Sequence, residues 1–171
     1  MIVADASPLI VLARLQRLGL LKDLYGEVLI GPIVKAEAID AGKKIRANGV
    51  EQLDAALASG WLRMVSLTAQ EQGLRQGLAG RSRLDRGEAE AIALASGRGL
   101  RLIVDDKEAR SVAAASGVPH LGTAGALLEA YLKRSLDMRE LEIAVRDLGQ
   151  ILWLSPAVVA EILRLARETD R

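Results

Sequence analysis

The 171-residue sequence contains no cysteine, no phenylalanine and a single histidine. The absence of cysteine excludes disulfides and thiolate metal sites. The histidine, His120, lies in a short apolar run without a partner in sight, so no Ser–His–Asp triad can be built around it. Aromatic residues make up only 2% of the chain, which is too few for an extensive base-stacking platform. These absences exclude several common types of catalytic and binding site.

Long hydrophobic runs and a strong net charge are also absent. No apolar run approaches the roughly 20 residues of a transmembrane helix, because Asp5, Arg14 and Lys22 interrupt the N-terminal stretch. That stretch also lacks the basic start and the cleavage site of a secretory signal. We therefore expect a cytoplasmic protein with no membrane association. The net charge of +1 is not that of a strongly basic nucleic-acid-binding protein, although acids gathered in one pocket would leave the remaining surface basic.

Short apolar runs alternate with helical patterns along a chain whose length suits one domain with a sizeable core. The runs cover residues 2–4, 28–30, 61–67, 100–104 and 118–121. Strands that alternate with helices pair in parallel through right-handed crossovers. We therefore predict an α/β fold, a parallel β-sheet flanked by helices on both faces, over residues 1–136. Two helices over residues 137–171 would form a C-terminal extension packed on the same domain.

Six acidic residues lie where strand ends and helix starts would converge. They are Asp5, Asp105 and Asp106, which follow apolar runs, and Glu37, Asp85 and Glu88, which lie in the first turns of helices. In an open parallel sheet these positions form one crevice, where ligands usually bind. Each pair of carboxylates ~5 Å apart repels by roughly 3 kcal/mol at an effective dielectric constant of ~20. A divalent cation such as Mg²⁺ or Mn²⁺, which prefers oxygen ligands, relieves that repulsion. The pattern predicts a metal site for phosphate chemistry.

Helix capping offers a purely structural role for some of these acids. Asp85 and Glu88 have the spacing of a capping box, in which the two side chains bind each other's backbone N–H groups. One residue of the pair Asp105 and Asp106 can cap the helix that follows. Successive strand residues point to opposite faces, so only one of this pair would face the pocket directly. Which of the two does so stays open from local reasoning.

Local signals also suggest roles for three other residues and one segment. Ser7, followed by Pro8, is the expected N-cap of the first helix, which would leave Asp5 free. Glu90 is expected off the acidic face, in solvent or paired with an arginine. Trp153 is expected in the core or in an interface, and the segment 12–21 is expected to expose apolar surface together with the region of Trp153.

Arginines accompany the acidic segments. Guanidinium groups bind phosphate through paired hydrogen bonds, and a solvated surface is the structural alternative for each. The candidates for contacts with RNA phosphates are Arg81, Arg83, Arg86 and Arg110. A second basic cluster consists of Lys43, Lys44 and Arg46.

Four segments together resemble the PIN domain, the metal-dependent ribonuclease family that includes VapC-type toxins. They are residues 3–10 (VADASPLI), 32–37 (PIVKAE), 84–91 (LDRGEAEA) and 103–107 (IVDDK). Residues 122–125 and 149–155 are similar to a subgroup of predicted nucleic-acid-binding PIN proteins. The resemblance therefore extends over nearly the whole chain and implies a PIN-like fold for residues 1–136.

The resemblance implies ligands for Mg²⁺ or Mn²⁺. These would be Asp5, Glu37, Glu88 and either Asp105 or Asp106, with Asp85 as a rival to Glu88, and Ser7 would help to order the site. The family pattern favours Asp106, whereas its capping geometry favours Asp105 as the inward group. We take Asp5, Glu37, Glu88 and Asp106 as the candidate catalytic residues.

The activity that the resemblance implies is metal-assisted hydrolysis of RNA phosphodiester bonds by an endoribonuclease, the toxin of a toxin–antitoxin pair. The expected partners are the RNA substrate, a small antitoxin protein and a second copy of the chain in a homodimer. One alternative is a non-catalytic PIN-fold module that binds RNA or protein, which the complete set of acids disfavours. Another is a DNA-directed nuclease of the flap-endonuclease kind, but the chain lacks the additional helical arch.

Overall fold

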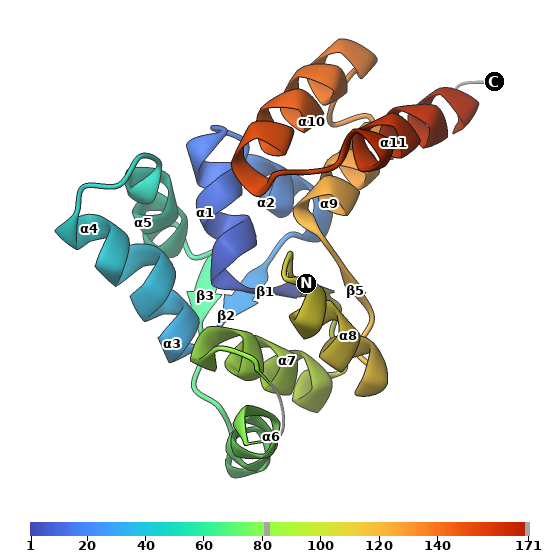
Figure 1. Cartoon of the computed structure of the whole chain (residues 1–171). Helices are drawn as coiled ribbons and strands as arrows, with labels where there is room; N and C mark the ends of the chain where they lie inside the picture. The colour runs from blue at the N-terminus through green and yellow to red at the C-terminus, as the bar shows by residue number, and fades with distance from the viewer. Residues whose placement is uncertain (81–82, 170–171) are drawn as a thin grey trace.

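The computed structural model describes residues 1–80 and 83–169 and contains a five-stranded parallel sheet with the strand order β3-β2-β1-β4-β5 (Figure 1). The strands are β1 (Ile2–Ala4), β2 (Val28–Ile30), β3 (Leu62–Met64), β4 (Leu102–Ile103) and β5 (His120–Leu121). All four pairings are parallel, which confirms the predicted α/β class. The last three strands are shorter than the apolar runs that predicted them.

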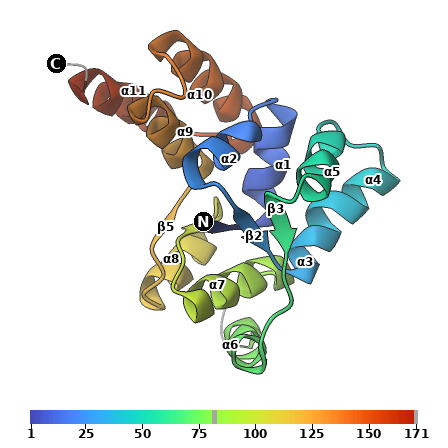
Figure 2. The same ribbon diagram turned by 180° about the vertical axis from the view of Figure 1, so that it is seen from behind.

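Helices cover both faces of the sheet. They are α1 (Ala6–Arg14), α2 (Gly19–Tyr25), α3 (Pro32–Lys35), the π-helical turn η1 (Ala36–Asp40), α4 (Ala41–Lys44), α5 (Val50–Ala58), α6 (Ala69–Ala79), α7 (Arg86–Arg98), α8 (Lys107–Ala115), α9 (Thr123–Leu132), α10 (Met138–Leu152) and α11 (Pro156–Thr169). Figures 1 and 2 show α1, α2, α5 and α9 on one side of the strands, and α7 and α8 on the other, with α6 outside α7. Helices α10 and α11 pack against α9.

The central strand β1 fixes the position of the crevice. Ile2, Val3 and Ala4 are fully buried, as expected for a strand that is covered on both faces. The chain leaves β1 toward β2 on one side and later returns to β4 on the other side. This reversal is the switch point of a doubly wound sheet, so the carboxyl ends of β1 and β4 open into a crevice.

Glu90 joins α7 to α3 beside this crevice, contrary to the prediction that it lies in solvent or pairs with an arginine. Its side chain is 2% exposed, and its Oε2 accepts hydrogen bonds from the backbone N–H groups of Ile33 (2.8 Å) and Val34 (3.0 Å). The residue that precedes α3 is Gly31, which has no side chain to cap the helix. A Cβ at Gly31 would lie 2.2 Å from the Glu90 carboxylate. Glu90 therefore supplies from α7 the cap that α3 lacks.

Apolar surface was expected to be exposed both along residues 12–21 and near Trp153, and only the second region exposes it. The segment 12–21 contributes to the core, with Leu12, Leu18 and Leu21 at most 2% exposed, so the expected exposed surface there is wrong. Trp153 is 91% exposed, so it does not lie in the core of the chain. No helix among the described residues is both long enough and apolar enough to cross a membrane.

Replacing Glu90 with alanine should lower the free energy of unfolding, because two N–H groups at the start of α3 lose their acceptor. Each unsatisfied group costs about 1–3 kcal/mol. Glu90→Gln should cost much less, because the amide oxygen can still accept and the buried carboxylate, whose pKa is raised chiefly by burial, is removed. Urea unfolding measures both variants. Glu51→Ala, on the exposed first turn of α5, is the control. Equal losses in the alanine and glutamine variants would contradict the capping role.

Candidate functional site

A cleft of about 600 Å³ at the carboxyl edge of the sheet collects the acidic residues from four chain segments. Its polar lining consists of Asp5, Ser7, Arg14, Glu37, Asp85, Glu88, Asp105 and Asp106. All six acids singled out in the sequence, together with Ser7, therefore lie around one hollow. The crevice expected from the sheet topology is present.

Asp5 lies deepest of the acids. It is itself the residue that precedes α1, and the helix begins at Ala6, so the prediction that Ser7 caps this helix is wrong. The Asp5 side chain makes no capping hydrogen bond and is 5% exposed. The pKa of Asp5 is raised from 3.8 to about 6, chiefly by burial and in part by the charges of Asp85 and Glu37, while the N–H groups of Ala6 and Ser7 offset part of the effect.

Glu37 enters the cleft from the π-helical turn η1, which interrupts the helix that begins at Pro32. Such turns occur frequently at functional sites. A Cβ at Gly87 would lie 2.2 Å from Glu37 Oε2, so the absence of a side chain on α7 leaves room for this carboxylate. Burial and then the charges of Asp85, Glu90 and Glu88 raise the pKa of Glu37.

Asp85 and Glu88 form the predicted capping box at the start of α7. Asp85 Oδ1 accepts from the N–H of Glu88 (2.7 Å), and Glu88 Oε2 accepts from the N–H of Asp85 (2.9 Å). Each side chain uses one oxygen in these bonds and keeps the other. The pKa of Glu88 is raised to about 7, chiefly by burial and further by the charges of Asp85, Asp106 and Asp5. Capping and participation in the cleft are therefore compatible.

Asp105 and Asp106 differ in how many of their oxygens are engaged. Both oxygens of Asp105 bind Thr123, one to its N–H and one to its hydroxyl, each at 2.7 Å. Asp106 caps α8 through Oδ1, which accepts from the N–H of Ala109 at 2.9 Å. Asp106 therefore retains Oδ2 for a ligand, whereas Asp105 is fully engaged in fixing the start of α9. This geometry favours Asp106 over Asp105 as the group available to a ligand.

The residues of the cleft have the chemistry that a divalent cation needs, but their side chains are not spaced to enclose one. The donors are carboxylate oxygens, which hard cations prefer. The pKa values of Asp5, Glu37 and Glu88 are raised chiefly by burial and further by repulsion from neighbouring acids, and a bound cation would favour the charged forms. No three carboxylates of the described residues are placed so that they could enclose an ion. Side-chain movement would have to bring them together for an ion to bind.

Three of the four arginines predicted to contact RNA, Arg83, Arg86 and Arg110, lie outside the lining of the cleft. Arg83 and Arg86 are exposed beside the start of α7, and Arg110 is exposed on α8, with its Nη1 3.4 Å from the position of a Cβ on Gly122. Arg81 lies outside the described residues. Sequence analysis missed Arg14, which does line the cleft. Its spacing from Ser7 and Ile10 on α1 is the signal that could have found it, because positions i, i+3 and i+7 share one helical face.

Apolar residues from the C-terminal helices close one side of the cleft. Ile151 and Leu152, at the end of α10, line it together with Ile10 and Val11 of α1. The residue that follows, the exposed Trp153, adopts a left-handed conformation (φ 52°) and ends α10. No local pattern in the sequence relates these residues to acids more than 40 positions earlier, so sequence analysis did not predict this wall.

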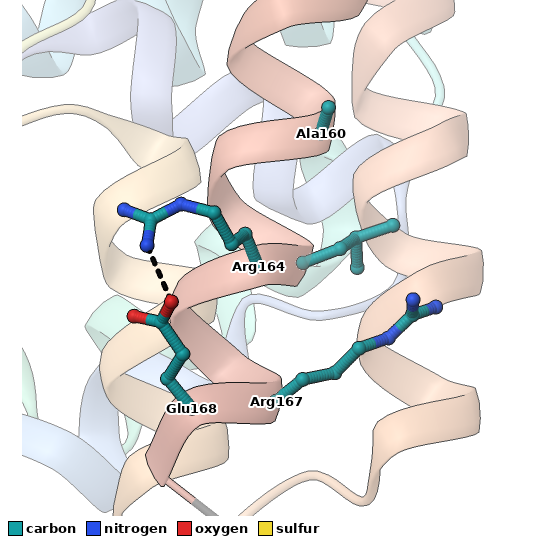
Figure 3. A pocket seen from close by; sticks show the side chains of 5 residues that line it. Ala160, Arg164, Arg167 and Glu168 are labelled. Carbon is teal, nitrogen blue, oxygen red and sulfur yellow. Dashed lines mark hydrogen bonds and ion pairs between the residues drawn. The ribbon is translucent and has the colours of Figure 1, made fainter.

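A separate hollow of about 470 Å³ lies along α11 and contains two arginines (Figure 3). Arg164 forms ion pairs with Glu161 and Glu168 of the same helix, and Arg167 pairs with Glu142 of α10. Their charges are already balanced by carboxylates. This hollow therefore lacks the unbalanced charge of the acidic cleft.

Comparisons with known proteins agree with this geometry. A family model, DUF3368, described as a PIN domain, matches residues 1–168. The search of curated proteins finds no match to the chain.

In the metal-free protein, the stability that the acids of the cleft contribute should fall as the pH rises from about 4 to about 7. Because the pKa of Asp5 is raised from 3.8 to about 6 on folding, its contribution is fully present below pH 3.8 and is lost as the pH rises through 6. Glu88 extends the loss toward pH 7. Asp5→Asn should therefore be more stable than the wild type at pH 8 in EDTA, by about 3 kcal/mol. Urea unfolding between pH 4 and pH 8 measures this difference. The surface variant Asp23→Asn should follow the wild type, and a pH profile unchanged by Asp5→Asn would contradict the burial of its charge.

Proposed function

Because the chain belongs to the PIN-domain family, whose members are typically nucleases that use divalent metals, we propose that it is an endoribonuclease dependent on Mg²⁺ or Mn²⁺. The proposed reaction is hydrolysis of phosphodiester bonds in RNA. The observation that carries the proposal is the single cleft lined by Asp5, Glu37, Asp85, Glu88 and Asp106. Asp85, Glu88 and Asp106 each retain one carboxylate oxygen without a hydrogen bond to the described residues.

In this proposal Asp5, Glu37, Glu88 and Asp106 hold the metal, and Asp85 is an additional ligand candidate. When bound, such an ion polarises phosphoryl oxygens and lowers the pKa of water, which is the chemistry that phosphodiester hydrolysis needs. Asp105 acts as a positioning residue, since its bonds to Thr123 fix the loop that carries Asp106. Ser7 adds a hydroxyl to the lining of the same cleft.

The other residues in and near the cleft have separate roles in the proposed reaction. Arg14 lines the cleft without an ion pair among the described residues, so its charge is available to a phosphate. Ile151 and Leu152 limit the access of bulk water on the opposite side, which strengthens electrostatic interactions inside the cleft. Arg83, Arg86 and Arg110 lie on the exposed surface nearby and would contact the RNA backbone farther from the scissile bond.

We further propose that the protein is the toxin of a toxin–antitoxin pair and acts as a homodimer. The proposal draws on the likeness to VapC-type toxins and on exposed apolar side chains of the C-terminal region, which are Trp153 (91%), Val158 (42%) and Leu165 (37%). Sedimentation at micromolar concentration distinguishes a dimer from a monomer. Co-purification with the product of a neighbouring small reading frame tests the antitoxin.

Mn²⁺ should raise the melting temperature of the wild-type protein, because only the folded chain gathers the carboxylates. At 100 times its dissociation constant, a ligand stabilises by about 2.7 kcal/mol, or about 5–10 °C for a domain of this size. Asp5→Asn should lose most of that increase, whereas Asp23→Asn on the surface of α2 should retain it. Differential scanning fluorimetry with and without Mn²⁺ measures the shift. Equal shifts in both variants would place the ion elsewhere.

Cleavage of single-stranded RNA should require a divalent metal and should cease in EDTA. Glu88→Gln and Asp106→Asn should each lower the cleavage rate by about 100-fold or more, because each loses a ligand charge. Asp105→Asn should lower it less, within the roughly 10–100-fold range of residues that orient ligands. The exposed variant Glu51→Gln is the control, and circular dichroism checks that each variant is folded. Cleavage that survives EDTA and all three substitutions would refute the metal-dependent mechanism.

A further inference from the structure

A groove continues from the acidic cleft between α1, the π-helical turn η1, α4 and α5. Its volume is about 420 Å³, and Ile10, Arg14 and Glu37 line both the groove and the cleft. The two hollows are therefore continuous, and Arg14 stands where they meet. If the scissile phosphodiester bond of an RNA strand lies at the carboxylates, the neighbouring nucleotide lies beside this groove.

The lining of the groove suits a flat apolar ring with a polar edge. Its small residues are Ala38, Ala41, Gly42 and Ala47, and larger apolar side chains stand around them. A Cβ on Gly42 would lie 3.0 Å from Val50 Cγ2, so the glycine allows α4 to approach α5. Asn48 is the one uncharged polar side chain of this lining, and its amide makes no hydrogen bond within the described chain. An amide offers both a donor and an acceptor to the edge of a base.

Unpaired positive charge surrounds the groove. Lys44 and Arg46 adjoin the lining residues Ile45 and Ala47, and both are exposed without an ion pair among the described residues. Two nearby lysines are already neutralised, Lys35 by Asp40 and Lys43 by Asp54. With Arg14, three cations without an ion pair among the described residues thus lie in or beside the groove, against two such carboxylates, Glu37 in the lining and Glu51 beside Val50. This balance favours a polyanion over an acidic or neutral peptide.

We infer that the groove holds an unpaired nucleobase of the RNA strand, one that neighbours the scissile phosphate. This inference rests on the proposed nuclease function and adds to it a site for one base beside the scissile bond. Arg14 contacts the phosphate between the cleft and the groove, and Lys44 and Arg46 contact the backbone beyond. A base in a duplex cannot enter, because its edge is paired and its faces are stacked, whereas the bases of loops and single strands can be turned outward. Asn48 reads the edge of the bound base.

Binding of fluorescein-labelled RNA decamers to the inactive Glu88→Gln protein tests the groove directly. Ala41→Leu fills the groove from an exposed helical position and should weaken binding of single-stranded decamers by about tenfold or more. Ala114→Leu, on the exposed side of α8, is the matched control and should bind as the parent does. Binding of a duplex of the same length should not respond to Ala41→Leu.

Two more variants separate base recognition from charge. Asn48→Ala, at an exposed position that is not expected to affect folding, should make the affinities for the A, C, G and U homopolymers more alike. Arg14→Gln should weaken all of them and reduce the dependence of log K on log salt by about one. If Ala41→Leu and Asn48→Ala bind every decamer as Ala114→Leu does, the inference is overturned. If RNA binding is unchanged but a dimer dissociates, the groove instead receives a second copy of the chain.

Cleavage assays on the same substitutions without Glu88→Gln distinguish this inference from the proposed function. Metal-dependent cleavage in the wild type with an unchanged KM in Ala41→Leu would preserve the nuclease and refute the groove. A wild type that binds decamers through the groove but cleaves none of them in Mn²⁺ would support the groove and refute the nuclease. The expected result is a KM raised about tenfold in Ala41→Leu with kcat little changed.

Discussion

Repulsion among the carboxylates of the cleft is opposed by the rest of the fold. The pKa of Asp5 is raised to about 6 and that of Glu88 to about 7, so both groups are held where their charged forms are disfavoured. The parallel sheet imposes this arrangement, because its switch point brings the ends of β1 and β4 together. The hydrogen bonds of Glu90 hold α7 to α3, the helix that leads into Glu37. The hydrogen bonds of Asp105 to Thr123 hold the segment that carries Asp105 and Asp106 at the start of α9.

Several residues of the cleft contribute both to folding and to the site. Asp85, Glu88 and Asp106 each use one oxygen to satisfy a backbone N–H at a helix start and keep one for the cleft. The helix starts therefore determine the direction of the acidic side chains before any ligand binds. A capping box in the sequence is thus no argument against a functional carboxylate.

The parts of the structure that could be predicted from the sequence depend on local patterns. Buried runs such as residues 2–4 and 28–30 predicted the strands, and the spacing of Asp85 and Glu88 predicted their capping box. Convergence of the acids followed from the general geometry of parallel sheets. The errors concern choices that tertiary contacts make. Ser7 is a residue type that often caps helices, but the helix begins two residues earlier than predicted, after Asp5.

Contacts between distant segments account for the remaining differences. Glu90 looks like a surface glutamate until Gly31, 59 positions earlier, leaves α3 without a cap of its own. Ile151 and Leu152 reach the cleft only because α10 packs against α9. Arg14 is the exception, since the helical period of α1 places it on the face of Ser7, and a search along that face would have found it.

The apolar wall of the cleft, Ile151 and Leu152, is synthesised after all of the acidic residues. Ile151 follows Asp106, the last acid of the cleft, by 45 positions. At about 5–20 residues per second, a ribosome needs about 2–9 s to add that length. During this interval the nascent chain carries every acidic residue of the cleft but lacks the wall that shields them from water. The site is therefore completed late, after the sheet that supports it has been made.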